Sequence, residues 1–167
     1  MTDDELKKFF YKNEIIKALM ENDLDTIYNL IPDEKSIPQI SKFLIDAEIY
    51  PWEYFKKKIP DYAFFGLNLH DYPIELNKSI EIICDFAFFD CYINDDNIYL
   101  ADTSVKSIGH KAFGKNEFVN LRLPETIRYV SSYAFDTDLC IDIPKKVEKD
   151  VRKYWSCGIP EFNIRWV

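Results

Sequence analysis

The stretch VKSIGHKAF, residues 105–113, decides the fold, because its last two residues recur at nearly regular steps along the chain. Ala-Phe occurs at steps of 24, 25 and 22 residues, at Ala63-Phe64, Ala87-Phe88, Ala112-Phe113 and Ala134-Phe135. An apolar group precedes each of the last three copies: Ile80, Ile82 and Ile83; Val105 and Ile108; Ile127 and Val130. Self-similarity at such a period indicates stacked repeats.

A second pattern lies between the Ala-Phe segments, where an apolar, a polar and an apolar residue follow one another. It occurs as Ile74-Glu75-Leu76, Ile98-Tyr99-Leu100, Leu121-Arg122-Leu123 and Ile141-Asp142-Ile143. Such alternation is typical of a short strand whose outer residues point inward and whose middle residue faces solvent. A unit of this size cannot bury its own apolar side, but stacked units close a continuous core.

We therefore predict a solenoid over residues 59–167, built from about four or five coils in which the triplets form one curved sheet. The small alanine lets the backbones of neighbouring coils approach, and the adjacent phenylalanine fills the space between them. The sequence predicts one buried column of rings: Phe64, Phe88, Phe113 and Phe135.

Residues 1–58 predict a helical cap at the amino end of the solenoid. Thr2 and Glu5 have the spacing of a capping box, followed by the apolar Leu6, Phe9, Phe10, Ile16 and Met20. Asp23 is the expected cap of a second helix that ends at Pro32, and Ser36 that of a third. The third helix should bury Ile40, Phe43, Leu44 and Ala47; a fourth should open at Pro51 and carry Lys56, Lys57 and Lys58 at its end.

These repeats resemble the BspA-type leucine-rich repeat of bacteria, protozoa and phages. The likeness rests on residues 105–113, on Leu123-Pro124 through Phe135, on Ala87-Phe88-Phe89-Asp90-Cys91 and on Ala63-Phe64-Phe65-Gly66. It covers roughly residues 59–150 and implies an α+β fold, a helical cap followed by a short leucine-rich-repeat solenoid. The unit after Val147 lacks Ala-Phe and offers Tyr154-Trp155 instead, so we expect a closing coil whose last strand lies within residues 162–167.

Composition disfavours some classes of function and of cellular location. The net charge of −8 disfavours direct binding to nucleic acid, and neither a long apolar segment nor a signal-like start predicts a membrane association. Cys84, Cys91, Cys140 and Cys157 lack metal-binding spacing, so we expect reduced core thiols and a cytoplasmic protein.

No residue pattern predicts catalysis, a metal or a cofactor. The two histidines, His70 and His110, have no neighbouring nucleophile pattern. Residues 94–97 (NDDN) and 136–138 (DTD) could be calcium ligands, but the repeat needs turns at both places, and Asn and Asp favour turns.

The middle residues of the strands are the predicted protein-binding site: Glu75, Tyr99, Arg122, Asp142 and Arg165, with Asn163 as an alternative to the last. A solvated face without a partner is the plainer interpretation of the same row. The leading hypothesis is a non-catalytic module that binds another protein. A second is a phage-encoded acidic inhibitor that occupies the basic nucleic-acid groove of a host defence enzyme, such as a CRISPR effector. An enzyme with an unfamiliar site is the third; the sequence does not predict the partner or the oligomeric state.

Overall fold

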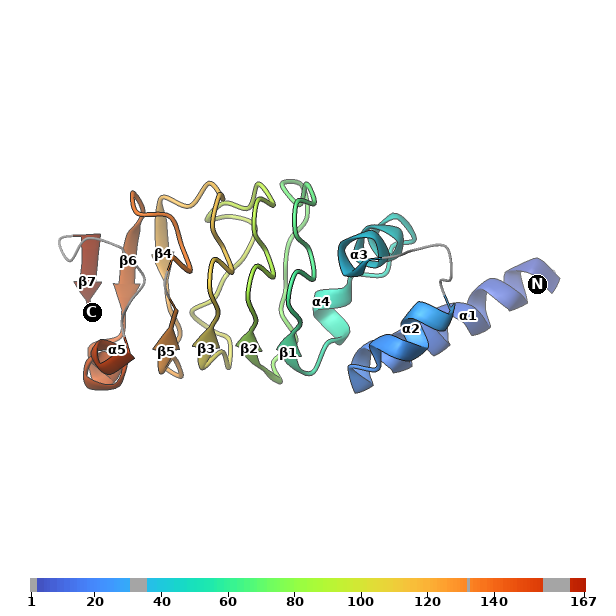
Figure 1. Cartoon of the computed structure of the whole chain (residues 1–167), viewed down its shortest axis with the longest axis horizontal. Helices are drawn as coiled ribbons and strands as arrows, with labels where there is room; N and C mark the ends of the chain where they lie inside the picture. The colour runs from blue at the N-terminus through green and yellow to red at the C-terminus, as the bar shows by residue number, and fades with distance from the viewer. Residues whose placement is uncertain (1–2, 31–35, 132, 155–162) are drawn as a thin grey trace.

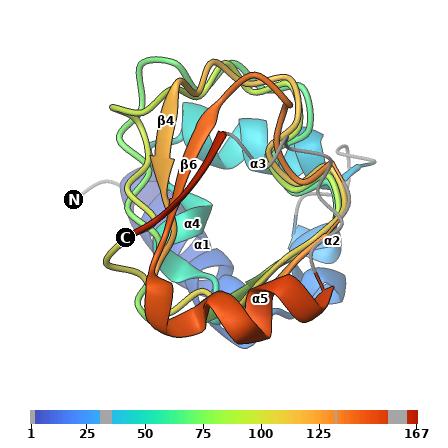
Figure 2. The ribbon, with the colours of Figure 1, turned by 90° about the vertical axis from the view of Figure 1, so that its left-hand side faces the viewer.

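The computed structural model describes residues 3–30, 36–131, 133–154 and 163–167, with side chains from residue 12 onward except those of Tyr28 and Tyr154. Helices occupy the amino end, and a solenoid of parallel strands follows (Figure 1). The coils superpose when the molecule is viewed along its long axis (Figure 2), as a leucine-rich-repeat solenoid requires. The predicted fold class is confirmed.

Four helices form the amino-terminal part: α1 (Asp3–Glu21), α2 (Leu24–Leu30), α3 (Ile37–Asp46) and α4 (Pro51–Tyr54). Asp23 caps α2 as predicted, because the Thr26 backbone N–H and hydroxyl donate to its carboxylate at 3.0 and 2.6 Å. The same two bonds lower the pKa of Asp23. Ser36 caps α3 by accepting from the Gln39 N–H. The proposed Thr2 capping box, the side chains of Leu6, Phe9 and Phe10, and Pro32 lie outside the described residues.

The buried face of α3 differs from the prediction. The helix buries Ile40, Ser41, Leu44 and Ile45, whereas Ala47 is exposed and Phe43 is 38% exposed. Ser41 explains the rotation, because its hydroxyl donates to the Ala63 carbonyl oxygen of the first coil at 2.5 Å. A polar contact with the solenoid therefore sets which face of α3 turns inward.

The lysine run also lies elsewhere than predicted. Helix α4 ends at Tyr54, and Lys57 and Lys58 already belong to the first strand, β1 (Lys57–Ile59). Lys57 has a positive φ of 63°, which turns the chain from the cap into the first coil. Lys57 and Lys58 thus stand in a strand, and only Lys56, which follows the C-cap residue Phe55, lies near the carboxyl end of α4.

The main sheet of the solenoid is not made by the predicted triplets. Four parallel strands pair in the order β1, β2 (Ile80–Ile83), β3 (Ser107–Ile108) and β5 (Tyr129–Val130). Strands β2, β3 and β5 come from the apolar groups ahead of the last three Ala-Phe copies, to which the sequence interpretation assigned no strand, and β1 comes from the end of the lysine run. A second sheet holds β4 (Asn120–Arg122), β6 (Cys140–Ile143) and β7 (Ile164–Trp166). Only this second sheet arises from the predicted triplets and from the expected final strand.

The Ala-Phe segments form the turns that stack the coils on one another. The phenylalanine N–H of each turn donates to the alanine carbonyl oxygen of the next coil at 2.8 Å, in all three steps from Phe64 to Ala134. The rings form the predicted column: Phe64 to Phe88 at 4.8 Å, Phe88 to Phe113 at 5.3 Å and Phe113 to Phe135 at 5.5 Å between centroids. All four rings are buried, so the column is confirmed.

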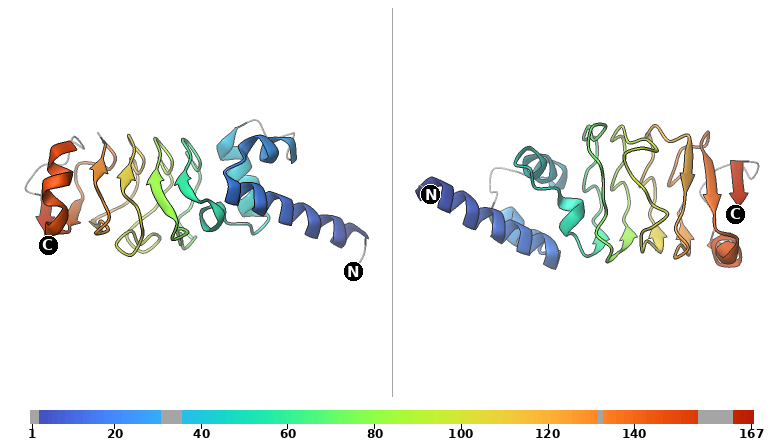
Figure 3. Two further views of the ribbon diagram at one scale, coloured as in Figure 1. Left: turned by 90° about the horizontal axis from the view of Figure 1, so that it is seen from below. Right: turned by 180° about the vertical axis from the view of Figure 1, so that it is seen from behind.

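Helical structure covers the amino end of the solenoid and forms one side of its last coil (Figures 1 and 2). Trp52 of α4 lies edge-on against Phe64 at 5.5 Å and closes the amino end of the ring column. At the other end, the chain passes through a 3-10 turn (Lys145–Val147) into α5 (Glu148–Tyr154), which buries Val151 (Figure 3). One apolar core runs continuously from Ile15 in α1 to Val151 in α5.

The cysteines follow the prediction in part. Cys84, Cys91 and Cys140 are free thiols; Cys91 is buried and the other two are half-buried. The Cys91 thiol donates to the Phe64 carbonyl oxygen at 2.9 Å, and burial raises the pKa of this thiol to about 12. Burial also raises the pKa of Cys84. Cys157 lies outside the described residues.

Candidate functional site

The predicted row of strand mid-positions lies on the outside of the coils. The apolar residues on both sides of Tyr99 and Arg122 are buried, and Tyr99 itself is 64% exposed. Glu75, Arg122 and Arg165 are exposed, and Asp142 is half-buried. Arg122, Asp142 and Arg165 are direct register partners across β4, β6 and β7. The alternation therefore placed these five side chains correctly; their role in binding stays a prediction.

The row crosses a break in strand pairing. Ile74 and Ile98 form a single bridge next to Glu75 and Tyr99, and regular pairing begins again only at β4. At the break, the Asp95 carboxylate accepts from the Val119 and Asn120 N–H groups at 3.2 and 2.9 Å. A carboxylate thus accepts here from two backbone N–H groups of the next coil.

Two hollows flank Tyr99. One of about 320 Å³ lies toward Glu75 and Lys78, and one of about 420 Å³ lies toward Arg122 and Glu125. Asp102 and Thr103 line both hollows and form the wall between them together with Tyr99. The Thr103 hydroxyl donates to the Leu100 carbonyl oxygen at 2.7 Å, which holds this wall in one conformation.

The charges along the row are not equivalent. Arg165 donates to the Asp142 carboxylate at 2.5 Å, so these two side chains neutralise each other. Glu125 accepts from Lys146, and this bond is the main cause of its lowered pKa, with Arg122 a smaller one. Arg122 itself forms no ion pair within the part of the chain that the structure describes. Glu75, Tyr99 and Arg122 are therefore more available to a partner than Asp142 and Arg165, and of these three only Tyr99 and Arg122 line the larger hollow.

The acidic turns and the two histidines that the sequence analysis considered for metal binding or catalysis take part in turns and ring contacts. The backbone N–H of Asp96 donates to the Asn94 side chain and that of Asn94 to the Asn97 side chain, as in an ordinary turn. Asp136 accepts from the Asn116 N–H at 3.2 Å. Among residues 3–30, 36–131, 133–154 and 163–167, no three His, Cys, Asp or Glu side chains gather as metal ligands would. The His110 ring lies edge-on to Phe86, and His70 is exposed in a loop.

Sequence reasoning missed both hollows. The clusters of turn residues around 94–97 and 101–104 were the available signal, since Asn, Asp, Ser and Thr there indicated loops beside the row. The depth of the hollows depends on how the loops of adjacent coils differ in length. The sequence of one repeat alone does not predict this difference.

Comparison with known proteins agrees with the geometry. A family model of the BspA type leucine rich repeat region matches residues 57–164 in six copies. No curated protein and no solved structure matches the chain. Leucine-rich repeats suggest a protein-interaction module, and a solenoid of this kind is typically a non-catalytic scaffold. In the described residues, no helix has the length and apolar character needed to cross a membrane.

Proposed function

Because this chain belongs to the BspA-type leucine-rich-repeat family, we propose that it binds another protein through the strand row, with Tyr99 and Arg122 as the central contacts. One observation carries the proposal: Tyr99 is 64% exposed between two hollows, and Arg122 lines the larger of them. Partner side chains could enter both hollows and enclose the phenol ring. Tyr and Arg in such central positions commonly dominate the binding energy of an interface.

The row favours a partner surface with both charge and apolar groups. Glu75 lines the first hollow with Lys78, and Arg122 lines the second with Glu125. A partner carboxylate would meet Arg122, since Glu125 is already paired with Lys146. The Asp102 carboxylate would accept from backbone N–H groups of the partner.

The experiment begins with affinity capture from the native host and mass spectrometry, followed by a binding assay on the identified protein. We expect Tyr99→Ala and Arg122→Ala each to weaken binding by more than about 1 kcal/mol, roughly fivefold in Kd or more. The matched control is Tyr92→Ala with Lys149→Ala, an exposed aromatic residue and an exposed cation elsewhere on the solenoid. Full affinity in the row double variant, or equal loss in the control, would refute the proposed site.

A second candidate function is inhibition of a nucleic-acid enzyme, favoured by the net charge of −8. In this reading the chain comes from a phage or another mobile element, and its carboxylates occupy a basic groove of a host defence enzyme. Such binding would weaken steeply between 50 and about 500 mM salt, because screening shortens the reach of surface charges. Binding through Tyr99 and the hollows would change much less over the same series.

We also propose that the protein works in a reducing compartment, such as the cytoplasm. The free thiols of Cys84, Cys91 and Cys140 support this location. Thiol titration of the unfolded protein, purified without reductant, should count four thiols, and a lower count would contradict the proposal.

A further inference from the structure

A second surface lies on the outside of the Ala-Phe turns, away from the strand row, and its residues range from exposed, as Tyr62 is, to buried, as Gly114 is. Two residues of each turn form it: the one before the alanine and the one after the phenylalanine. The first series is Tyr62, Phe86, Lys111 and Tyr133, and the second is Phe65, Phe89, Gly114 and Asp136. We call these eight residues the turn face.

The aromatic residues of the turn face stack from coil to coil. Tyr62 and Phe86 lie 5.0 Å apart with their ring planes 3° from parallel, and Phe65 and Phe89 lie 5.3 Å apart at 12°. These rings add nothing to the core column, because Phe64 and Phe88 already fill it. Tyr62, Phe86 and Tyr133 also adopt positive φ angles of 59°, 57° and 53°. Large side chains disfavour this conformation, so turn formation alone does not account for aromatic residues here.

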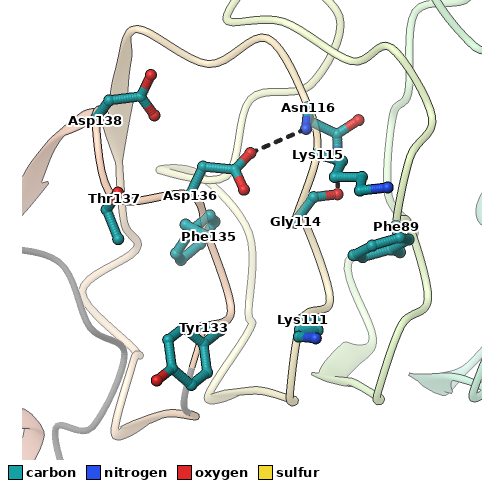
Figure 4. A pocket seen from close by; sticks show the side chains of 10 residues that line it. All are labelled: Phe89, Lys111, Gly114, Lys115, Asn116, Tyr133, Phe135, Asp136, Thr137 and Asp138. Carbon is teal, nitrogen blue, oxygen red and sulfur yellow. Dashed lines mark hydrogen bonds between the residues drawn. The ribbon is translucent and has the colours of Figure 1, made fainter.

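The second stack stops at Gly114, where the preceding two coils carry phenylalanine. A hollow of about 660 Å³ opens at this place (Figure 4). Phe89 lines one side of it, and Tyr133, Phe135 and Asp136 line the other. A Cβ atom at position 114 would lie 3.1 Å from the Phe89 ring, so Phe89 leans over the glycine into the opening.

The rim of the hollow carries cations on the side of Phe89. The Lys111 ammonium lies 5.9 Å from the centre of the Phe86 ring, and the Lys115 ammonium lies 5.4 Å from that of Phe89. Neither lysine pairs with a carboxylate among the described residues, although the chain has a net charge of −8. At the far end, Asp136 accepts from the Asn116 N–H and Asp138 is exposed. The two lysines thus offer charge complementarity to an anionic group near Phe89.

We propose that the turn face binds a segment of a partner protein in which an aromatic residue stands next to an acidic one. The aromatic ring enters the hollow and continues the interrupted stack of Phe65 and Phe89. The neighbouring carboxylate pairs with Lys111 and Lys115, and the flexible Lys115 side chain moves off the Phe89 ring to meet it. An aromatic occupant fits because the existing rings set the spacing and orientation that a further ring would adopt.

This surface is independent of the strand row, so the two proposals fail separately. The test uses the full chain, labelled with ¹⁵N, and the synthetic peptide acetyl-Gly-Glu-Phe-Gly-amide followed by heteronuclear NMR. We expect shifts at the amides of Phe89, Gly114 and Lys115, with a Kd of about 1 mM for so short a probe. Replacing the peptide's phenylalanine by leucine, or its glutamate by glutamine, should weaken binding at least fivefold. Two outcomes would overturn the proposal. One is the absence of shifts at these amides up to 5 mM peptide, about fivefold the expected Kd. The other is equal binding of the leucine peptide.

Two variants of the protein sharpen the test. Gly114→Phe gives the third coil the phenylalanine that the first two coils carry at this position. The added ring should fill the hollow and reduce peptide affinity more than tenfold. Lys115→Asn removes the charge and tolerates the positive φ of 55° at this position, so it should weaken the glutamate peptide at least threefold. If Gly114→Phe does not fold, the peptide affinity of Lys115→Asn is the deciding measurement. An affinity equal to that of the wild type would overturn the proposal. Tyr99→Ala with Arg122→Ala should leave peptide binding intact; weaker binding in that double variant would place the peptide on the strand row and likewise overturn it.

Discussion

Replacing Phe113 by alanine tests the stacking of the coils at its centre. Phe113 is fully buried between Phe88 at 5.3 Å and Phe135 at 5.5 Å, with both pairs of ring planes 2° from parallel. Phe118 contacts the same ring edge-on at 5.9 Å. The substitution therefore removes one ring from the middle of a column and leaves a space that neighbours on three sides cannot easily fill.

The expected cost follows from this environment. Removing a buried phenylalanine side chain commonly destabilises a protein by about 3–5 kcal/mol, through lost burial and the remaining cavity. Two parallel stacking contacts place Phe113→Ala in the upper half of that range. For a chain of this size, the midpoint of thermal unfolding should fall by about 8–20 °C.

The assay is thermal and urea unfolding followed by circular dichroism, with Tyr133→Ala as the matched control. Tyr133 is 55% exposed, so its loss should change the free energy of unfolding by less than about 1 kcal/mol. Phe135→Ala should fall between the two, because Phe135 stacks on only one ring of the described column. A shift for Phe113→Ala no larger than that for Tyr133→Ala would refute the stacked-column account of the fold.

Three further predictions concern single residues. Gly109→Ala should destabilise the fold by about 1–3 kcal/mol in urea unfolding, because its Cβ would lie 2.7 Å from the backbone of the preceding coil at Cys84 and Asp85. Asp95→Ala should leave the Val119 and Asn120 N–H groups without their acceptor and cost about 1–3 kcal/mol, with Asp95→Asn costing less because one acceptor oxygen remains. The folded-state pKa of Cys91 is raised from 9.0 to about 12, so this thiol favours folding below pH 9 and loses that contribution as the pH rises toward 12. Relative to Cys91→Ser, the wild-type free energy of unfolding should fall by about 1.4 kcal/mol per pH unit above pH 9.

The repeat made the solenoid predictable, because alanine and phenylalanine must recur wherever coils stack. The sequence was less informative about which apolar segments pair as strands. Ile80–Ile83 contains three isoleucines without strict alternation, and Ile82 is 42% exposed, so period alone did not identify β2. Conversely, Ile74 and Ile98 alternate well but form only one bridge, and between Ile98 and β4 the Asp95 carboxylate accepts from the backbone N–H groups of Val119 and Asn120.

The amino-terminal cap shows the limit of helical periodicity. Counting apolar residues selected Phe43 and Ala47 for the buried face of α3, but Ser41 is buried there instead. Its hydroxyl bonds to Ala63, a partner 22 residues away in sequence, and such a contact exists only once the first coil has formed. Helix position could be read locally from the caps, whereas helix orientation depended on the tertiary structure.

The candidate sites divide in the same way. Strand alternation was enough to place Tyr99 and Arg122 outside the core, since a middle residue between two buried ones must face outward. The hollows on either side of Tyr99, and the one at Gly114, come from differences between adjacent coils. These differences lie in loop length and in the missing side chain at Gly114. The hollows that result from them become visible only when the coils are stacked in the structure.

Stacking constrains the inner and outer positions of the coils differently, and this bears on function. The inner positions repeat, with alanine and phenylalanine in four successive turns, because each ring must match its neighbour above and below. The outer positions change from coil to coil, as Glu75, Tyr99 and Arg122 do on one side and Phe86, Lys111 and Tyr133 on another. The strand-row side chains Glu75, Tyr99 and Arg122 are exposed, so their chemistry can vary without loss of the fold, whereas Phe86 also stacks on Tyr62 of the preceding coil. We therefore expect recognition to depend on the order of the coils. Exchanging Tyr99 and Arg122, the exposed middle residues of two neighbouring coils, should alter binding while leaving the midpoint of thermal unfolding nearly unchanged.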